Sequence, residues 1–131
     1  MATIEDKYNQ VIKMTNLKQY HDRGFKGQGI VIANIEGTIG DEHGRNVKET
    51  ILTYAPEASV ISYNDVYDRS SISDGNGALG FPLFVDWCIE NKVNIVSSSL
   101  DWSCDKPEEQ AALQRLYDAG IIFLNCAGNS G

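Results

Sequence analysis

Three residues of this sequence have side chains that could do chemistry together: Glu36 and His43, which are close in sequence, and Asn129, which is far from both. A carboxylate can orient an imidazole, and an imidazole can accept and return a proton. A carboxamide at the mouth of a parallel sheet can donate a hydrogen bond to an oxyanion. Such chemistry requires that the fold bring the three side chains together.

The hydrophobic pattern predicts strands that alternate with helices. Apolar runs predict strands over residues 30–35, 59–63, 93–98 and 121–126. Helical spacing predicts helices over residues 4–22, 43–54, 81–89 and 107–119. In the third of these helices Pro82 is placed in the first turn, and in the fourth Tyr117 is placed on the inward face. Residues 64–80 are rich in Ser, Asp, Asn and Gly and predict a loop.

This alternation predicts right-handed crossovers and an α/β fold, in which a mainly parallel sheet is flanked by helices in three layers. We expect one domain over residues 1–131, with an N-terminal helix in 1–23 and the α/β core in 24–131. Ligand chemistry in such folds gathers at the carboxyl ends of the strands. Glu36, Ser99 and Asn129 each follow a predicted strand, so we expect them on one edge of the sheet.

Composition excludes some partners. Eleven basic against eighteen acidic residues give a net charge of −7, which argues against nucleic acid and anionic membranes as main partners. No run reaches the ~20 apolar residues that span a bilayer, and the first residues lack a secretory signal pattern. The three cysteines lack a Cys-x-x-Cys spacing and predict unbonded thiols, typical of the cytoplasm.

Five segments resemble, in the same order, the subtilisin-like serine proteases (subtilases). They are residues 27–36, 41–47, 55–58, 84–100 and 127–129. The resemblance implies a subtilisin-like fold and peptide hydrolysis, with Glu36 as the acid, His43 as the base and Asn129 as the oxyanion donor. It also implies that a peptide binds as an added strand between two edges. The residues at those edges are Gly75, Asn76, Gly77, Ser99 and Leu100.

The chain departs from the family pattern at several points. Glu36 stands where the family usually has Asp, and only residues 37–42 separate it from His43. The second His of the family's helix motif is Asn46, and the Gly after Ser-Leu is Asp101. No segment matches the helix start that carries the nucleophilic serine, so the resemblance covers the N-terminal portion of the family. We therefore expect this chain alone to be inactive.

Two other functions fit the same pattern. The chain fits a pseudoprotease, a degenerate half kept as a peptide-binding or interaction module, and an unrelated doubly wound ligand-binding domain. No cofactor is expected, because the spacing of Asp65, Asp68 and Asp74 fits no calcium-loop pattern. The strand predicted over residues 121–126 would present an apolar edge, so we also expect self-association.

Overall fold

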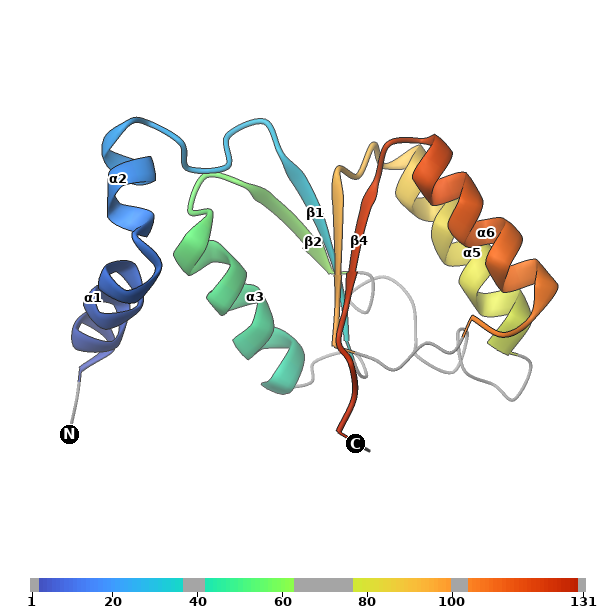
Figure 1. Ribbon diagram of the computed structural model, residues 1–131, viewed down its shortest axis with the longest axis horizontal. Coiled ribbons are helices and arrows are strands. Elements are labelled where there is room, and N and C mark those ends of the chain that lie inside the picture. The colour runs from blue at the N-terminus through green and yellow to red at the C-terminus, as the bar shows by residue number, and fades with distance from the viewer. Residues whose placement is uncertain (1–2, 37–41, 63–76, 100–103, 130–131) are drawn as a thin grey trace.

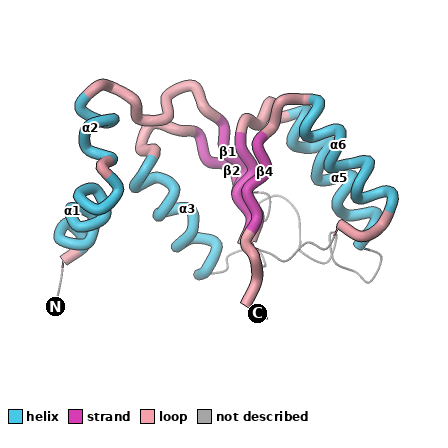
Figure 2. Tube along the Cα trace, viewed as in Figure 1, coloured by secondary structure: helices cyan, strands magenta, loops and turns pink. Residues whose placement is uncertain are grey.

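The computed structural model describes residues 3–36, 42–62, 77–99 and 104–129 and contains a four-stranded sheet (Figure 1). Its strands are β1 (Val31–Ile35), β2 (Ser59–Ser62), β3 (Ile95–Ser98) and β4 (Ile122–Asn125). They run in the order β2-β1-β3-β4, and every neighbouring pair is parallel. Helix α3 (Glu42–Tyr54) covers one face, and α5 (Gly77–Glu90) and α6 (Pro107–Asp118) cover the other (Figure 2). The predicted three-layer α/β fold is confirmed.

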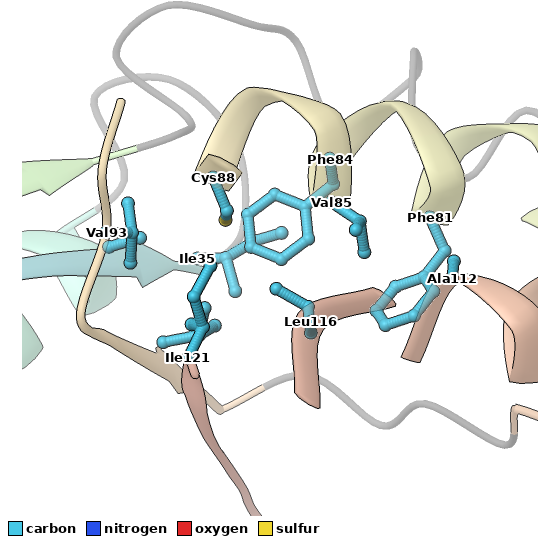
Figure 3. Close-up of a cluster of buried hydrophobic side chains, with 11 residues drawn as sticks. Ile35, Phe81, Phe84, Val85, Cys88, Val93, Ala112, Leu116 and Ile121 are labelled. Atoms are coloured by element: carbon cyan, nitrogen blue, oxygen red, sulfur yellow. The ribbon is translucent and has the colours of Figure 1, made fainter. Parts of the chain in front are cut away.

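The hydrophobic core lies between the sheet and the layer of α5 and α6 (Figure 3). Alternate strand residues and one face of each helix supply its buried side chains: Ala33, Ile35, Phe81, Phe84, Val85, Cys88, Val93, Val96, Ala112, Leu116 and Ile121. Burial raises the pKa of the Cys88 thiol to about 12, so this thiol is chemically inert at neutral pH. The core thus holds β1 in place, and it also positions Glu36, the residue that follows this strand.

The opposite face of the sheet becomes more polar toward the carboxyl ends of the strands. One row across this face is entirely apolar and consists of Val60, Ile32, Ile95 and Ile122. The next row, two residues further along each strand, consists of Ser62, Asn34, Ser97 and Leu124. Glu36 and Ser99 lie beyond that row. The polar end of this face is therefore the edge at which the sequence places the candidate site residues.

The N-terminal segment differs from the expectation. Residues 4–22 form two helices, α1 (Ile4–Thr15) and α2 (Leu17–Asp22), and not one. The break is at Asn16, whose φ of 56° places it in the left-handed region. Asn is one of the few residues that visit this region routinely, because its short side chain can hydrogen-bond locally. The prediction of one continuous helix is therefore wrong.

Helix α5 begins earlier than its spacing indicated. It starts at Gly77, so the end of the predicted 64–80 loop is helical and Pro82 is the sixth helical residue, outside the first turn. Tyr117, expected to face inward, is 78% exposed on α6. Within the described residues, no helix is long and apolar enough to cross a membrane.

Candidate active site

Glu36 is held at the carboxyl edge of the sheet by its strand. It follows β1, which lies between β2 and β3, and its side chain is only 2% exposed. The backbone N–H of Ser99, the residue after β3, donates a hydrogen bond of 3.1 Å to Oε1 of Glu36. Burial raises the pKa of Glu36 above its ordinary value, while the Ser99 hydrogen bond and the nearby His43 oppose that rise.

His43 meets the other oxygen of the same carboxylate. It is the second residue of α3, and its Nε2 lies 3.2 Å from Oε2 of Glu36. The His43 side chain is 60% exposed, whereas Glu36 is buried. A buried carboxylate thus lies against an imidazole that is exposed at the surface.

The contact uses a particular nitrogen of the imidazole. In a Ser-His-Asp triad the acid binds Nδ1–H, and Nε2 takes the proton of the nucleophile. Here Glu36 faces Nε2 of His43. A neutral imidazole that donates Nε2–H to this carboxylate has Nδ1 as its basic nitrogen. Glu36 and His43 therefore correspond to the acid and the base of such a triad, but the opposite nitrogen of the imidazole faces the acid.

The first turn of α3 lies directly against β1. A Cβ added to Gly44 would come within 3.5 Å of Cβ of Glu36. Nδ2 of Asn34, a residue only 1% exposed, donates a hydrogen bond of 3.3 Å to the carbonyl oxygen of Gly44. Sequence reasoning missed Asn34. The available signal was a polar residue inside an otherwise apolar strand.

Asn129 reaches the same edge of the sheet without joining the pair. The backbone N–H of Cys126 donates to the carbonyl of Ser98 at 3.1 Å, which continues the β3–β4 ladder to the carboxyl edge. Asn129 is exposed on the segment that follows β4, and the carboxyl end of β4 and the start of α3 lie at the same lower edge in Figure 1. The contacts described for Glu36 and His43 do not include Asn129.

The predicted peptide-binding residues divide into three groups. Ser99 lies beside Glu36, through its backbone N–H. Gly77 is the first residue of α5. Gly75, Asn76 and Leu100 lie outside the described residues.

The described part of the chain holds no group of three or more His, Cys, Asp or Glu side chains that could bind a metal ion. Asp65, Asp68 and Asp74, considered above for calcium, lie outside that part.

Comparisons with known proteins point in the same direction, although no family model matches. The chain is 26% identical to a thermostable alkaline protease of Halalkalibacterium halodurans, over 99% of this chain and 44% of that protein. It is 29% identical to the major intracellular serine protease of Bacillus subtilis, over 96% of this chain and 39% of that protein. A third relative, the minor extracellular protease Epr of Bacillus subtilis, is 27% identical over 75% of this chain and 14% of its own length.

The chain thus spans less than half the length of these relatives. Its α/β fold is consistent with the similarity. Over most of its length, the chain is thus similar, at 26–29% identity, to subtilisin-like serine proteases.

Proposed function

We propose that this region supplies the acid and the base of a subtilisin-like serine endopeptidase site. Glu36 orients His43 and stabilises its protonated form, and His43 accepts the proton of a serine hydroxyl as that oxygen attacks a peptide carbonyl. His43 then returns the proton to the departing amine. The observation that carries this proposal is the 3.2 Å contact between the buried Glu36 carboxylate and the exposed His43 imidazole.

Two further roles belong to the proposal. Asn129 donates a hydrogen bond to the oxyanion of the tetrahedral intermediate. The substrate peptide lies as an added strand between two edges, which consist of Gly75, Asn76, Gly77, Ser99 and Leu100. The position of Asn129 and Ser99 at the carboxyl edge supports both roles, because substrates of parallel sheets bind there.

The proposal assigns the nucleophile to no serine of these 131 residues. The 131-residue polypeptide by itself is then inactive, because loss of the nucleophile costs such an enzyme about a million-fold in turnover. A fluorophosphonate probe is expected to leave every serine unlabelled, as judged by intact mass. Stoichiometric labelling of any one serine would contradict this assignment.

A chimera tests the roles of the acid and the base. This chain replaces the matching 44% of the thermostable alkaline protease of Halalkalibacterium halodurans, and hydrolysis of a peptide nitroanilide is measured. His43→Ala is expected to lower kcat/KM by about 10²–10⁴-fold. His21→Ala is the matched control, because Nε2 of His21 contacts the carbonyl of Tyr54 at 2.8 Å, at the other end of α3. Equal effects of the two substitutions in a folded chimera would refute the role of His43.

A second candidate function is a peptide-binding module without catalysis. It is supported by the contact between His43 and Glu36, because the nitrogen that faces the acid is Nε2 and not the Nδ1 of a triad. In the same chimera, peptide binding without hydrolysis, in a protein with native circular dichroism, would select this function.

We also propose a cytoplasmic location. Its support is that Cys88, Cys104 and Cys126 form no disulfide, as is usual in a reducing compartment. Cell fractionation followed by immunoblotting tests it, and recovery from the culture medium would overturn it.

A further inference from the structure

Asn34 is a buried amide in the middle of the central strand pair. It lies on β1 opposite Ser62 of β2 and Ser97 of β3, and it is 1% exposed. Its position is two residues before Glu36, so both side chains point to the face of the sheet that α3 covers. Burying an amide costs free energy unless it is hydrogen-bonded, and a valine would suit this strand position better.

The hydrogen bond of Asn34 goes to one particular place on α3. Its Nδ2 donates to the carbonyl oxygen of Gly44, the residue directly after His43. Oδ1 of Asn34 is buried and has no hydrogen-bond partner in the described part of the chain. The amide orientation is set by this contact, because a carbonyl oxygen can accept only from the NH₂ group.

The first turn of α3 is thereby attached to β1 at two consecutive residues. His43 contacts Oε2 of Glu36 at 3.2 Å, and the carbonyl of Gly44 accepts from Asn34 at 3.3 Å. A Cβ added to Gly44 would lie 3.5 Å from Cβ of Glu36, an ordinary van der Waals distance, so this turn lies directly against the end of β1. Two neighbouring contacts restrain this turn against the end of β1 more than either contact would alone.

We propose that Asn34 is a positioning residue that holds the first turn of α3 so that the imidazole of His43 stays on the Glu36 carboxylate. This inference deepens the proposed function and rests on it. Asn34 touches neither a substrate nor the reacting atoms, and it acts through the backbone of Gly44. The neighbouring serines on β2 and β3 do not substitute for it, because no described hydrogen bond links Ser62 or Ser97 to α3.

A double-mutant cycle on the 131-residue chain tests the proposal. The measured quantity is the pKa of Glu36, obtained from its carboxyl ¹³C shift during an NMR titration. His43 lowers this pKa, so His43→Gln is expected to raise it. Asn34→Val is expected to raise it by at least half as much, because the imidazole is no longer held in place.

The cycle separates positioning from solvation. An apolar side chain at position 34 also raises the pKa of Glu36 by making its surroundings less polar. That second effect persists in the His43→Gln background, whereas an effect that acts through His43 disappears there. An Asn34→Val shift of equal size in both backgrounds would overturn the proposal.

Two controls complete the experiment. Gly44→Ala alters the same turn but keeps its carbonyl group, and its Cβ would make an ordinary contact with Glu36, so it is expected to leave the Asn34 effect intact. Asn34→Leu repeats the test with a side chain of similar length. If both apolar variants unfold, Asn34 serves the fold as a whole and the proposal is overturned. If His43→Gln leaves the pKa of Glu36 unchanged, the acid–base pair itself fails, and the proposed function fails with it.

Discussion

The backbone N–H of Ser99 donates to Oε1 of Glu36 at 3.1 Å and so joins the residue after β3 to the residue after β1. The other carboxylate oxygen of Glu36 faces His43. Each oxygen thus has its own contact, one with the main chain of the sheet and one with the side chain of a helix. Glu36 is therefore held by the main chain of the sheet, whereas His43 lies on the helix that covers the sheet.

Glu36→Gln is expected to change how stability depends on pH. Burial raises the pKa of Glu36, so the folded state binds its proton more tightly than the unfolded state does. The stability that this group contributes is therefore largest at low pH, and it falls as the pH rises from the ordinary value of 4.5 through the raised pKa. The variant is expected to match the wild type near pH 4 and to be the more stable of the two at pH 7, by a free-energy difference that grows as the pH rises.

Urea unfolding between pH 4 and pH 7.5 measures this difference. Glu90→Gln, at an exposed position on α5, is the control and should show no such trend. A difference between wild type and Glu36→Gln that stays constant with pH would contradict the prediction.

The tautomer of His43 is a second prediction. Because Glu36 faces Nε2, the neutral imidazole is expected to carry its proton there, and long-range ¹⁵N–¹H correlation spectra distinguish the two tautomers. Glu36→Ala should shift the tautomer ratio toward that of a solvated histidine. Observation of the Nδ1–H form in the wild type would show that the ring turns its other nitrogen to the acid, as in a triad.

Gly27→Ala is expected to destabilise the fold more than Gly24→Ala does. Both glycines have a positive φ, 89° and 88° respectively, so alanine is strained at either position. That strain costs roughly 1–2 kcal/mol. Only at Gly27 would the new Cβ also overlap neighbours, at 2.9 Å from Ala55 and 3.0 Å from Ala58. Overpacking of this kind adds about 1–3 kcal/mol, so thermal unfolding should separate the two variants by several degrees.

We propose that the 131-residue polypeptide self-associates through β4. In the described sheet β4 is an edge strand, and its side chains Ile122 and Leu124 are 55% and 57% exposed. The N–H groups of Ile122 and Cys126 point to β3, so the main-chain groups of the alternate residues point away from the sheet. Such an edge pairs readily with another strand.

Sedimentation velocity over a range of concentrations tests this association. Leu124→Lys is expected to abolish it, because a charge on an edge strand blocks pairing. Leu83→Lys is the matched control, since Leu83 is 62% exposed but lies on α5. A concentration-independent monomer in the wild type would refute the proposal.

The sequence predicts the elements with continuous patterns and misses those that depend on a single dihedral angle or on a distant partner. The apolar run around Ile32 required a buried strand whatever surrounded it. The break at Asn16 depends on one residue taking a left-handed angle, which no hydrophobic period reports. Tyr117 was misplaced because it lies at the margin of the apolar face of α6, where a small rotation of the helix decides exposure.

The candidate site was predictable in its composition and not in its contacts. Glu36 and His43 are separated by only six residues, and both lie at ends of elements, so their approach follows from the topology. The hydrogen bond from Ser99 uses a backbone group 63 residues away, and main-chain donors carry no sequence signature. The role of Asn34 likewise requires knowing which turn of α3 lies above β1.

The face of the sheet toward α3 changes from an apolar row at Ile32 to a polar row at Asn34 within one step along the strands. Water therefore has favourable partners only near the carboxyl ends, and local opening should begin there while the apolar half stays closed. The edge that carries Glu36 and His43 is expected to fluctuate without unfolding the remainder of the sheet.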